Sequence, residues 1–245
     1  MIQKQVTYER LDKLLSRLGY GSRNDVRYWL KEGWVTVQGS VPKSPSERVD
    51  VDTVEIEGAP LDHPHGLTII YHKPLGSVCS HKESGRLVYD DFPARWKERK
   101  PAFSCVGRLD KETSGLLFLT DDGQLNHQIT SPKYHVPKRY DVYLAEALRG
   151  NEAELFAKGT LMLDGDDTPC LPAELIVHDA RHVEVVLQEG RYHQVRRMFA
   201  AVGNHVEGLA RTHVGALSLA DLALPAGGYC VIAPEQLLNA ILGVK

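Results

Sequence analysis

The stretch GRLDKETSGLLFLT, residues 107–120, places a carboxylate on a glycine-flanked loop directly before an apolar strand. Residues 116–120 form a short apolar run, as expected of a strand in a protein core. A loop held between core strands presents its side chains on a rigid scaffold and leaves them open to a cleft. Asp110 is therefore the first candidate for a catalytic group, although a single aspartate in a turn more often binds backbone N–H groups.

Strands and helices are predicted on both sides of this loop. The predicted strands are 67–71, 102–106, 116–120, 139–145, 173–177 and 182–188, and the predicted helices are 123–130, 151–158 and 194–202. Strands outnumber helices and the connections are short. This pattern favours an α+β fold with a mixed, largely antiparallel sheet over a doubly wound parallel sheet.

The N-terminal part has a different pattern. Leucines at 11, 14, 15 and 18 follow the spacing of an amphipathic helix that ends at Gly19 and Gly21. Ser22, three residues before Asp25, is a predicted N-cap for a second helix that Gly33 stops, and Val35–Val37 follows as a strand. Five basic residues lie off the apolar positions and are free to face phosphates: Arg10, Lys13, Arg23, Arg27 and Lys31.

Composition indicates a soluble globular protein, with 42% hydrophobic and 25% charged residues. No apolar run reaches the roughly 18 residues of a membrane span, and residues 1–10 lack a signal-peptide pattern, so we expect a cytoplasmic protein. The net charge of −3 is weak evidence against a nucleic-acid partner. Basic residues are nevertheless clustered in residues 1–45, which carry a net charge of +4, and in residues 95–100 and 191–197.

The cysteines and histidines do not form a metal-binding pattern. Cys79, Cys105, Cys170 and Cys230 are far apart and contain no CxxC pair, so buried free thiols are expected. His178 and His182 have helical spacing, but residues 179–181 resemble a turn between strands. We therefore expect no metal.

Three further segments could contribute to a site. Lys73-Pro74-Leu75-Gly76 follows a strand and predicts a rigid turn. Tyr140, in the segment 138–140, begins a strand and could stack on a base. The string EGRYHQVRRM, residues 189–198, puts Arg196 and Arg197 in the first turns of a helix, where cations need an anionic partner or solvent.

Two resemblances connect these segments. Residues 10–39, RLDKLLSRLGYGSRNDVRYWLKEGWVTVQG, resemble the S4 RNA-binding domain. The order KPxG, GRLD, KxY and EGRYHQVRRM resembles the RsuA family of pseudouridine synthases over nearly the whole chain. The strings at 120–135 and 189–206 are more similar to the small-subunit ribosomal RNA enzyme than to its large-subunit relatives.

The resemblance implies a role for each candidate residue. Asp110 would be the catalytic aspartate, and Arg196 would form an ion pair with it. Tyr140 would stack on the target uracil and assist proton removal from C5. The other implied substrate-binding residues are Arg108, Lys73, Gly76 and Arg197, together with Arg10, Lys13, Arg23 and Arg27 of the S4-like part.

The resemblance also implies an activity and an organisation. We expect an S4-like RNA-binding domain at 1–62 and a catalytic domain at 67–245, in a monomer that needs no cofactor. The expected substrate is a uridine in 16S small-subunit ribosomal RNA, free or in an assembly intermediate. The alternatives are a synthase acting on 23S large-subunit RNA, a non-catalytic S4-type assembly factor, and a glycosidase using Asp121 and Asp122.

Overall fold

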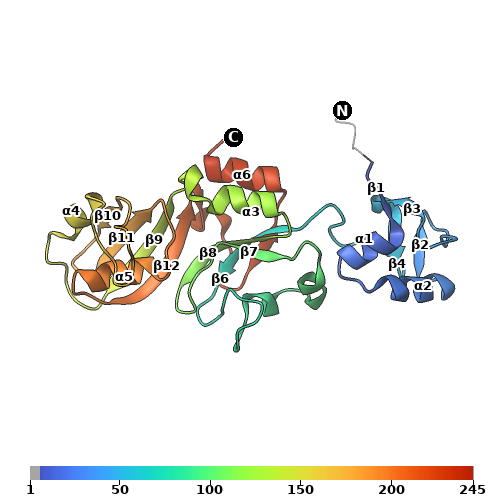
Figure 1. Cartoon of the computed structure of the whole chain (residues 1–245), viewed down its shortest axis with the longest axis horizontal. Helices are drawn as coiled ribbons and strands as arrows, with labels where there is room; N and C mark the ends of the chain where they lie inside the picture. The colour runs from blue at the N-terminus through green and yellow to red at the C-terminus, as the bar shows by residue number, and fades with distance from the viewer. Residues whose placement is uncertain (1–5, 245) are drawn as a thin grey trace. The chain divides into compact units, whose positions relative to one another are not determined.

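The computed structural model describes residues 6–244, which divide into two units (Figure 1). The first unit contains the chain up to Thr68 together with residues 92–104 and 120–123. The second contains residues 69–91, 105–119 and everything from 124 onward. The ends of the predicted domains, residues 1–5 with Lys4 and residue 245, lie outside the described residues.

The first unit begins with two helices and five short strands. Its elements are β1 (Tyr8–Arg10), α1 (Leu11–Arg17), α2 (Arg23–Lys31), β2 (Val35–Val37), β3 (Arg48–Asp50), the 3-10 helix η1 (Val51–Thr53), β4 (Val54–Ile56) and β5 (Ala59–Pro60). Strand β1 pairs with β3, and β2, β4 and β5 form a second antiparallel sheet. The predicted leucine stripe of α1 is fully buried against valines of these strands.

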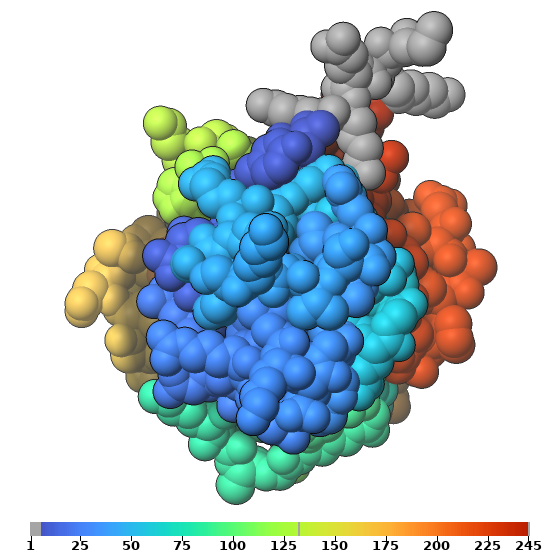
Figure 2. Space-filling model, turned by 90° about the vertical axis from the view of Figure 1, so that its right-hand side faces the viewer, coloured from blue at the N-terminus to red at the C-terminus, as the bar shows by residue number. Residues whose placement is uncertain are grey.

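The predicted cap of α2 is confirmed. Asp25 donates its N–H to Ser22 Oγ at 3.3 Å, and Ser22 donates its N–H to the Asp25 carboxylate at 2.6 Å, which forms a capping box. Gly19 and Gly33 take the left-handed conformation just after the two helices, at φ of 79° and 71°. In the space-filling view the residues of this helical pair and its strands form a rounded blue surface (Figure 2).

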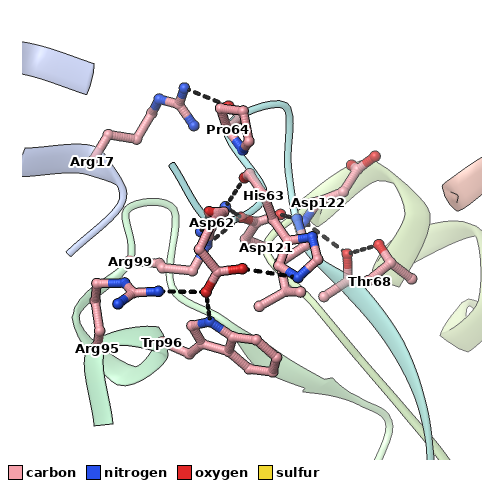
Figure 3. Close-up of polar contacts among 12 residues, drawn as sticks. Arg17, Asp62, His63, Pro64, Thr68, Arg95, Trp96, Arg99, Asp121 and Asp122 are labelled. Atoms are coloured by element: carbon pink, nitrogen blue, oxygen red, sulfur yellow. Dashed lines mark hydrogen bonds and ion pairs between the residues drawn. The ribbon is translucent and has the colours of Figure 1, made fainter. Parts of the chain in front are cut away.

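A polar network holds three separate segments of the first unit together (Figure 3). Arg99, which is 2% exposed, donates to the Asp121 carboxylate at 2.8 Å and to the His63 carbonyl at 2.9 Å. Asp62 accepts from Arg95 and from the Trp96 indole. Two arginines of the predicted basic cluster at 95–100 therefore form internal ion pairs.

The second unit is built on a mixed sheet. The strand order is β10-β11-β9-β12-β8-β6-β14, with β13 paired to β12 and β7 paired to β8. The strands are β6 (Thr68–Lys73), β7 (Ser104–Val106), β8 (Ser114–Thr120), β9 (Lys138–Leu144), β10 (Glu174–Val177), β11 (His182–Leu187), β12 (Val206–Val214), β13 (Leu217–Ser218) and β14 (Tyr229–Val231). Strand β12 is antiparallel to β9 and parallel to β8, so the expected mixed α+β fold is confirmed.

Helices cover two parts of this sheet. Helices α4 (Glu152–Ala157) and α5 (Gln194–Ala201) pack on β9, β11 and β12, with Phe156 and Phe199 in edge contact. Helices α3 (Gly123–Thr130) and α6 (Pro234–Leu242) lie together on β6 and β8 (Figure 1). The remaining 3-10 turns are η2 (Val88–Asp91), η3 (Ala94–Glu98), η4 (Pro132–Tyr134) and η5 (Ala220–Leu222). None of the helices in the described part of the chain has the length and apolar character of a membrane crossing.

The four cysteines are free thiols, and residues 179–181 form a turn. Cys79 and Cys170 are buried, Cys105 and Cys230 are half-buried, and all four are free. The predicted turn at 179–181 is confirmed, because the Asp179 carboxylate caps the N–H groups of Arg181 and His182 between β10 and β11. Among the described residues no group of three His, Cys, Asp or Glu side chains is arranged around a common metal position.

Candidate active site

Asp110 lines a cavity of about 630 Å³ in the second unit. The walls include the loop between β7 and β8, parts of β9 and β12, and residues 189–195, which lead into the first turn of α5. Arg108 and Tyr140 line the same cavity, so three of the predicted site residues are brought together. The Asp110 side chain is 29% exposed, which leaves its carboxylate accessible from the cavity.

The backbone of the Asp110 loop is fixed from two sides. Gly76 donates its N–H to the Lys111 carbonyl at 2.8 Å, and Lys73 Nζ donates to the Thr113 carbonyl at 2.9 Å. Thr113 donates its N–H to the Asp110 carbonyl at 3.0 Å. The KPLG turn therefore acts on the main chain of the loop that carries the carboxylate.

Lys73 is fully buried, and it does not line the cavity. Burial lowers the pKa of Lys73, while the nearby Cys79 and Asp110 oppose this effect. The family resemblance implied that Lys73 and Gly76 bind the substrate. Their observed partners are backbone carbonyls, those of Lys111 and Thr113 in the loop and of Pro74 in the turn itself, so both residues support the loop from behind the site.

The predicted Asp110–Arg196 ion pair is wrong. Arg196 donates through Nη2 to the Glu112 carbonyl at 2.7 Å and through Nη1 to the Val206 carbonyl at 2.8 Å. These two carbonyls hold the guanidinium, so it anchors the loop to β12 and forms no ion pair with the Asp110 carboxylate within the described residues. The EGRYHQVRRM segment thus supports the loop at residues 110–113 from α5, in addition to the support that the KPLG turn gives.

The basic side chain that lies within 4 Å of Asp110 was not among the residues predicted from the sequence. His193 Nε2 lies 3.4 Å from Asp110 Oδ1, and the His193 ring is stacked on Tyr192 with centroids 3.9 Å apart. His193 has a φ of 48°, a left-handed conformation that is uncommon for residues other than glycine and that often occurs at functional sites. Only its place beside the arginines in the HQVRR string marked it beforehand.

Tyr140 is held in place by the neighbouring strands. It lies on β9 between Val185 of β11 and Arg211 of β12, and its ring packs against the core under α5. A half-buried ring on a cavity wall in a central strand has a fixed orientation. This geometry suits stacking on a planar ligand.

Arg197 binds protein groups. It donates to the Asp166 carboxylate at 2.6 Å and to the Asp164 carbonyl, while Arg191 donates to the other oxygen of Asp166 at 3.0 Å. Both arginines lower the pKa of Asp166, and Arg197 has the larger effect. Of the two alternatives left open for this helix terminus, an anionic partner or solvent, the structure gives Arg197 an anionic partner, a carboxylate of the 164–169 loop.

The four basic candidates of the first unit differ in their contacts. Arg10 donates to the Asp12 carboxylate at 2.9 Å and 3.2 Å. Lys13, Arg23 and Arg27 are exposed and have no ion-pair partner within residues 6–244. Three of the four are therefore free to meet phosphates.

Two more basic residues, Lys138 and Arg211, line the cavity. Lys138, at the start of β9, lines the wall, and burial followed by the nearby Arg211 lowers its pKa to about 8. Arg211 is 5% exposed and donates through Nε to the Leu116 carbonyl at 2.8 Å. Arg211 was not among the predicted site residues, because the strand that carries it was not predicted from the sequence.

The chain belongs to the RNA pseudouridylate synthase family, whose model matches residues 67–201, and it carries an S4 domain at residues 9–54. It is 39% identical over 233 residues to ribosomal small subunit pseudouridine synthase A of Pasteurella multocida, covering 93% of this chain and 97% of the relative. It is 37% identical to the enzyme of that name from Escherichia coli, covering 95% and 100%.

Two further comparisons agree with this assignment. An uncharacterized RNA pseudouridine synthase of Bacillus subtilis, YtzG, is 38% identical over 93% of this chain and 96% of its own length. A solved structure described as a pseudouridylate synthase superposes with a TM-score of 0.65 at 34% identity and covers 94% of this chain and 99% of the other. The resemblances stated from the motifs are confirmed for both the family and the S4 domain.

Proposed function

We propose that this protein isomerises a uridine in small-subunit ribosomal RNA to pseudouridine, with Asp110 as the catalytic residue. The observation that carries the proposal is the Asp110 carboxylate, which is accessible in a cavity that Tyr140 also lines. The main chain of the Asp110 loop is held by hydrogen bonds from the KPLG turn and from Arg196. The small-subunit relatives supply the RNA class. In this assignment the S4 domain binds RNA through its free basic residues.

The proposed reaction conserves every atom of the uridine. The N1–C1′ bond breaks, the uracil turns, and a C5–C1′ bond forms; C5 then loses its proton and N1 gains one. The Asp110 carboxylate assists bond cleavage as a nucleophile or by stabilising positive charge on the sugar. The reaction as written needs no redox partner.

The uridine must leave its stack to reach this cavity. Flipping costs a few kcal/mol. Stacking on Tyr140 returns about 1–3 kcal/mol of this. Arg108 is exposed at the mouth of the cavity, where it is placed to contact the RNA around the flipped nucleotide.

We further propose the domain limits 1–62 and 67–245, a monomer, and a cytoplasmic location that follows from the ribosomal substrate. The matched family segments, 9–54 and 67–201, fall within these limits.

The test is chemical mapping of pseudouridine in ribosomal RNA from cells with and without the gene, together with tritium release from C5-labelled transcripts. Loss of one small-subunit pseudouridine in the deletion strain supports the proposal. Loss of a pseudouridine from large-subunit RNA instead would show that this RNA is the substrate. Unchanged maps and no tritium release would favour a non-catalytic assembly factor, and free uracil among the products would indicate a glycosidase.

Replacing Tyr140 by Phe should leave RNA binding unchanged and reduce kcat by roughly 10²-fold, because the ring still stacks but cannot take part in proton transfer. Single-turnover kinetics and filter binding separate the two effects. Tyr143→Phe is the matched control, because Tyr143 lies on the same strand but is stacked on His182 outside the Asp110 cavity. If Tyr140→Phe behaves like the control, the hydroxyl has no role.

RNA affinity should fall as the pH rises through about 8. Because the pKa of Lys138 is lowered to about 8, its ammonium loses its charge near this pH, whereas an ordinary lysine, with a pKa of 10.5, stays charged. Losing one cation from the cavity wall should weaken binding by about fivefold. Lys138→Arg should remove this decline between pH 7 and 9 because arginine stays charged. Identical pH profiles for the two proteins would contradict the assignment.

A further inference from the structure

Arg211 is a buried cation whose guanidinium has an unused donor. Its Nε donates to the Leu116 carbonyl at 2.8 Å, while its Nη2 is buried and has no hydrogen-bond partner. The residue is only 5% exposed, and it forms no ion pair within the described part of the chain. A buried polar group without a partner is unfavourable, so such groups in native proteins call for an explanation.

The same cavity contains a second unpartnered group. Thr113 is 1% exposed, and its Oγ1 has no hydrogen-bond partner. Both residues line the cavity that holds Asp110. Thr113 directly precedes β8, and Arg211 lies on β12. These two strands are parallel neighbours in the sheet, and Gly115 of β8 pairs with Arg211 (Figure 1).

The close approach of these strands is built into the sequence. Gly115 has a φ of 111°, and a Cβ at this position would lie 2.2 Å from the Arg211 carbonyl oxygen. Only glycine allows the two backbones to meet in this way. The two unpartnered groups are therefore held on a rigid part of the sheet, where movement toward solvent is restricted.

The burial and the hydrogen-bonding chemistry of Arg211 and Thr113 indicate which kind of ligand atom they would bind. Asp110 is 29% exposed, whereas Arg211 and Thr113 are almost fully buried, so these two groups form the inner end of the cavity. The phosphates of an RNA chain stay at the surface of a protein. A flipped base with its ribose near Asp110 enters with the atoms opposite the sugar foremost, and in uracil these include O4.

We propose that Arg211 Nη2 donates a hydrogen bond to O4 of the target uracil and that Thr113 Oγ1 completes this contact. The proposal rests on the proposed function and goes beyond it by assigning base selection to two residues. Cytosine has an amino group at C4, which would place N–H groups against the guanidinium. The pair would therefore select uridine over cytidine.

The experiment is a cycle that combines one atom of the RNA with one side chain. The substrate is a hairpin of the ribosomal RNA that contains the mapped uridine, made with uridine, 4-thiouridine or 2-thiouridine at that position. Sulfur is a poor acceptor. With the unsubstituted protein, 4-thiouridine should lower kcat/KM by about 10- to 100-fold, as expected for one lost hydrogen bond to a charged group, and 2-thiouridine should have little effect.

Removing the donor should abolish that sensitivity. In Arg211→Met the ratio of kcat/KM for uridine and 4-thiouridine should fall close to one, and Thr113→Val should reduce it in part. Arg139→Lys is the control that should keep the full ratio, because Arg139 lies on β9, pairs with Glu184 at 3.2 Å and does not line the cavity. Thr113→Val replaces a side chain of the same shape, so it decides the matter if Arg211→Met does not fold.

Two results would overturn the proposal. One is an unsubstituted protein that treats uridine and 4-thiouridine alike, and the other is full retention of the ratio in the folded variants. Failure of the proposed function has a different signature, since no protein would then form pseudouridine in the unsubstituted hairpin.

Discussion

Replacing Asp110 by Asn should reduce pseudouridine formation by roughly 10³-fold or more, as expected when a group that takes part in bond cleavage is removed. The charge is what matters, because the amide cannot act as a nucleophile and does not stabilise a cation. Tritium release under single-turnover conditions measures the change.

The loop should keep its shape in this variant. The carbonyls of residues 110–113 accept hydrogen bonds from Thr113, Gly76, Lys73 and Arg196, and none of these bonds involves the carboxylate. Thermal stability and RNA affinity should therefore stay close to those of the unsubstituted protein. Asp167→Asn is the control for loss of one surface charge, because Asp167 is exposed and lies outside the cavity. Activity of Asp110→Asn within tenfold of this control would refute the assignment.

Replacing Arg99 by Met should destabilise the protein by about 3–5 kcal/mol, the range expected when one partner of a buried ion pair is removed. The side chains of Arg99 and Asp121 are only 1% and 10% exposed, so the remaining carboxylate would stay buried without its cation (Figure 3). The His63 carbonyl would also lose its donor. Urea denaturation followed by tryptophan fluorescence measures the change in the free energy of unfolding.

Two further variants make this test specific. Lys158→Met breaks a surface pair with Glu154 whose side chains are 54% and 72% exposed, and it should change stability by less than about 1 kcal/mol. The double variant Arg99→Met with Asp121→Asn should lose less than the sum of the single changes, because neither charge is then left alone. Additive losses would show that the two residues act independently.

Local patterns were sufficient to predict several elements. The leucine spacing of α1 and the Ser22–Asp25 cap depend only on neighbouring residues, so both followed from the sequence. The apolar run of β8 and the glycine-flanked loop before it predicted that Asp110 lies on a loop beside a core strand and faces a cavity. The arrangement of the KPLG and HQVR segments around this loop could not be derived in this way. It entered through the family resemblance.

The central strand β12 was missed for a physical reason. Its sequence VEGLARTHV includes Gly208 and a buried arginine, and two register shifts against β9 interrupt the alternation of apolar and polar residues. A search for a regular two-residue period does not find such a strand. Arg211 is carried by this strand and was missed with it.

The partners of Arg196 and Arg99 could not be predicted from the sequence either. Arg196 and Arg99 both occur in basic clusters, which usually face solvent or phosphates. The fold instead gives Arg196 two carbonyls and gives Arg99 a buried carboxylate. These partners are 10 to 84 positions away in the chain, and only the tertiary structure brings them together.

The way the Asp110 loop is anchored has a consequence for how this chain can vary. Its anchors act on main-chain oxygens, which every amino acid possesses, while the side chains of Lys111 and Glu112 are exposed. Substitution at these two positions can therefore alter the charge presented to RNA without redirecting the carboxylate. We therefore expect substitutions at Lys111 and Glu112 to be tolerated. Substitutions at Lys73 and Arg196, which donate to the main-chain carbonyls of the loop, should not be tolerated.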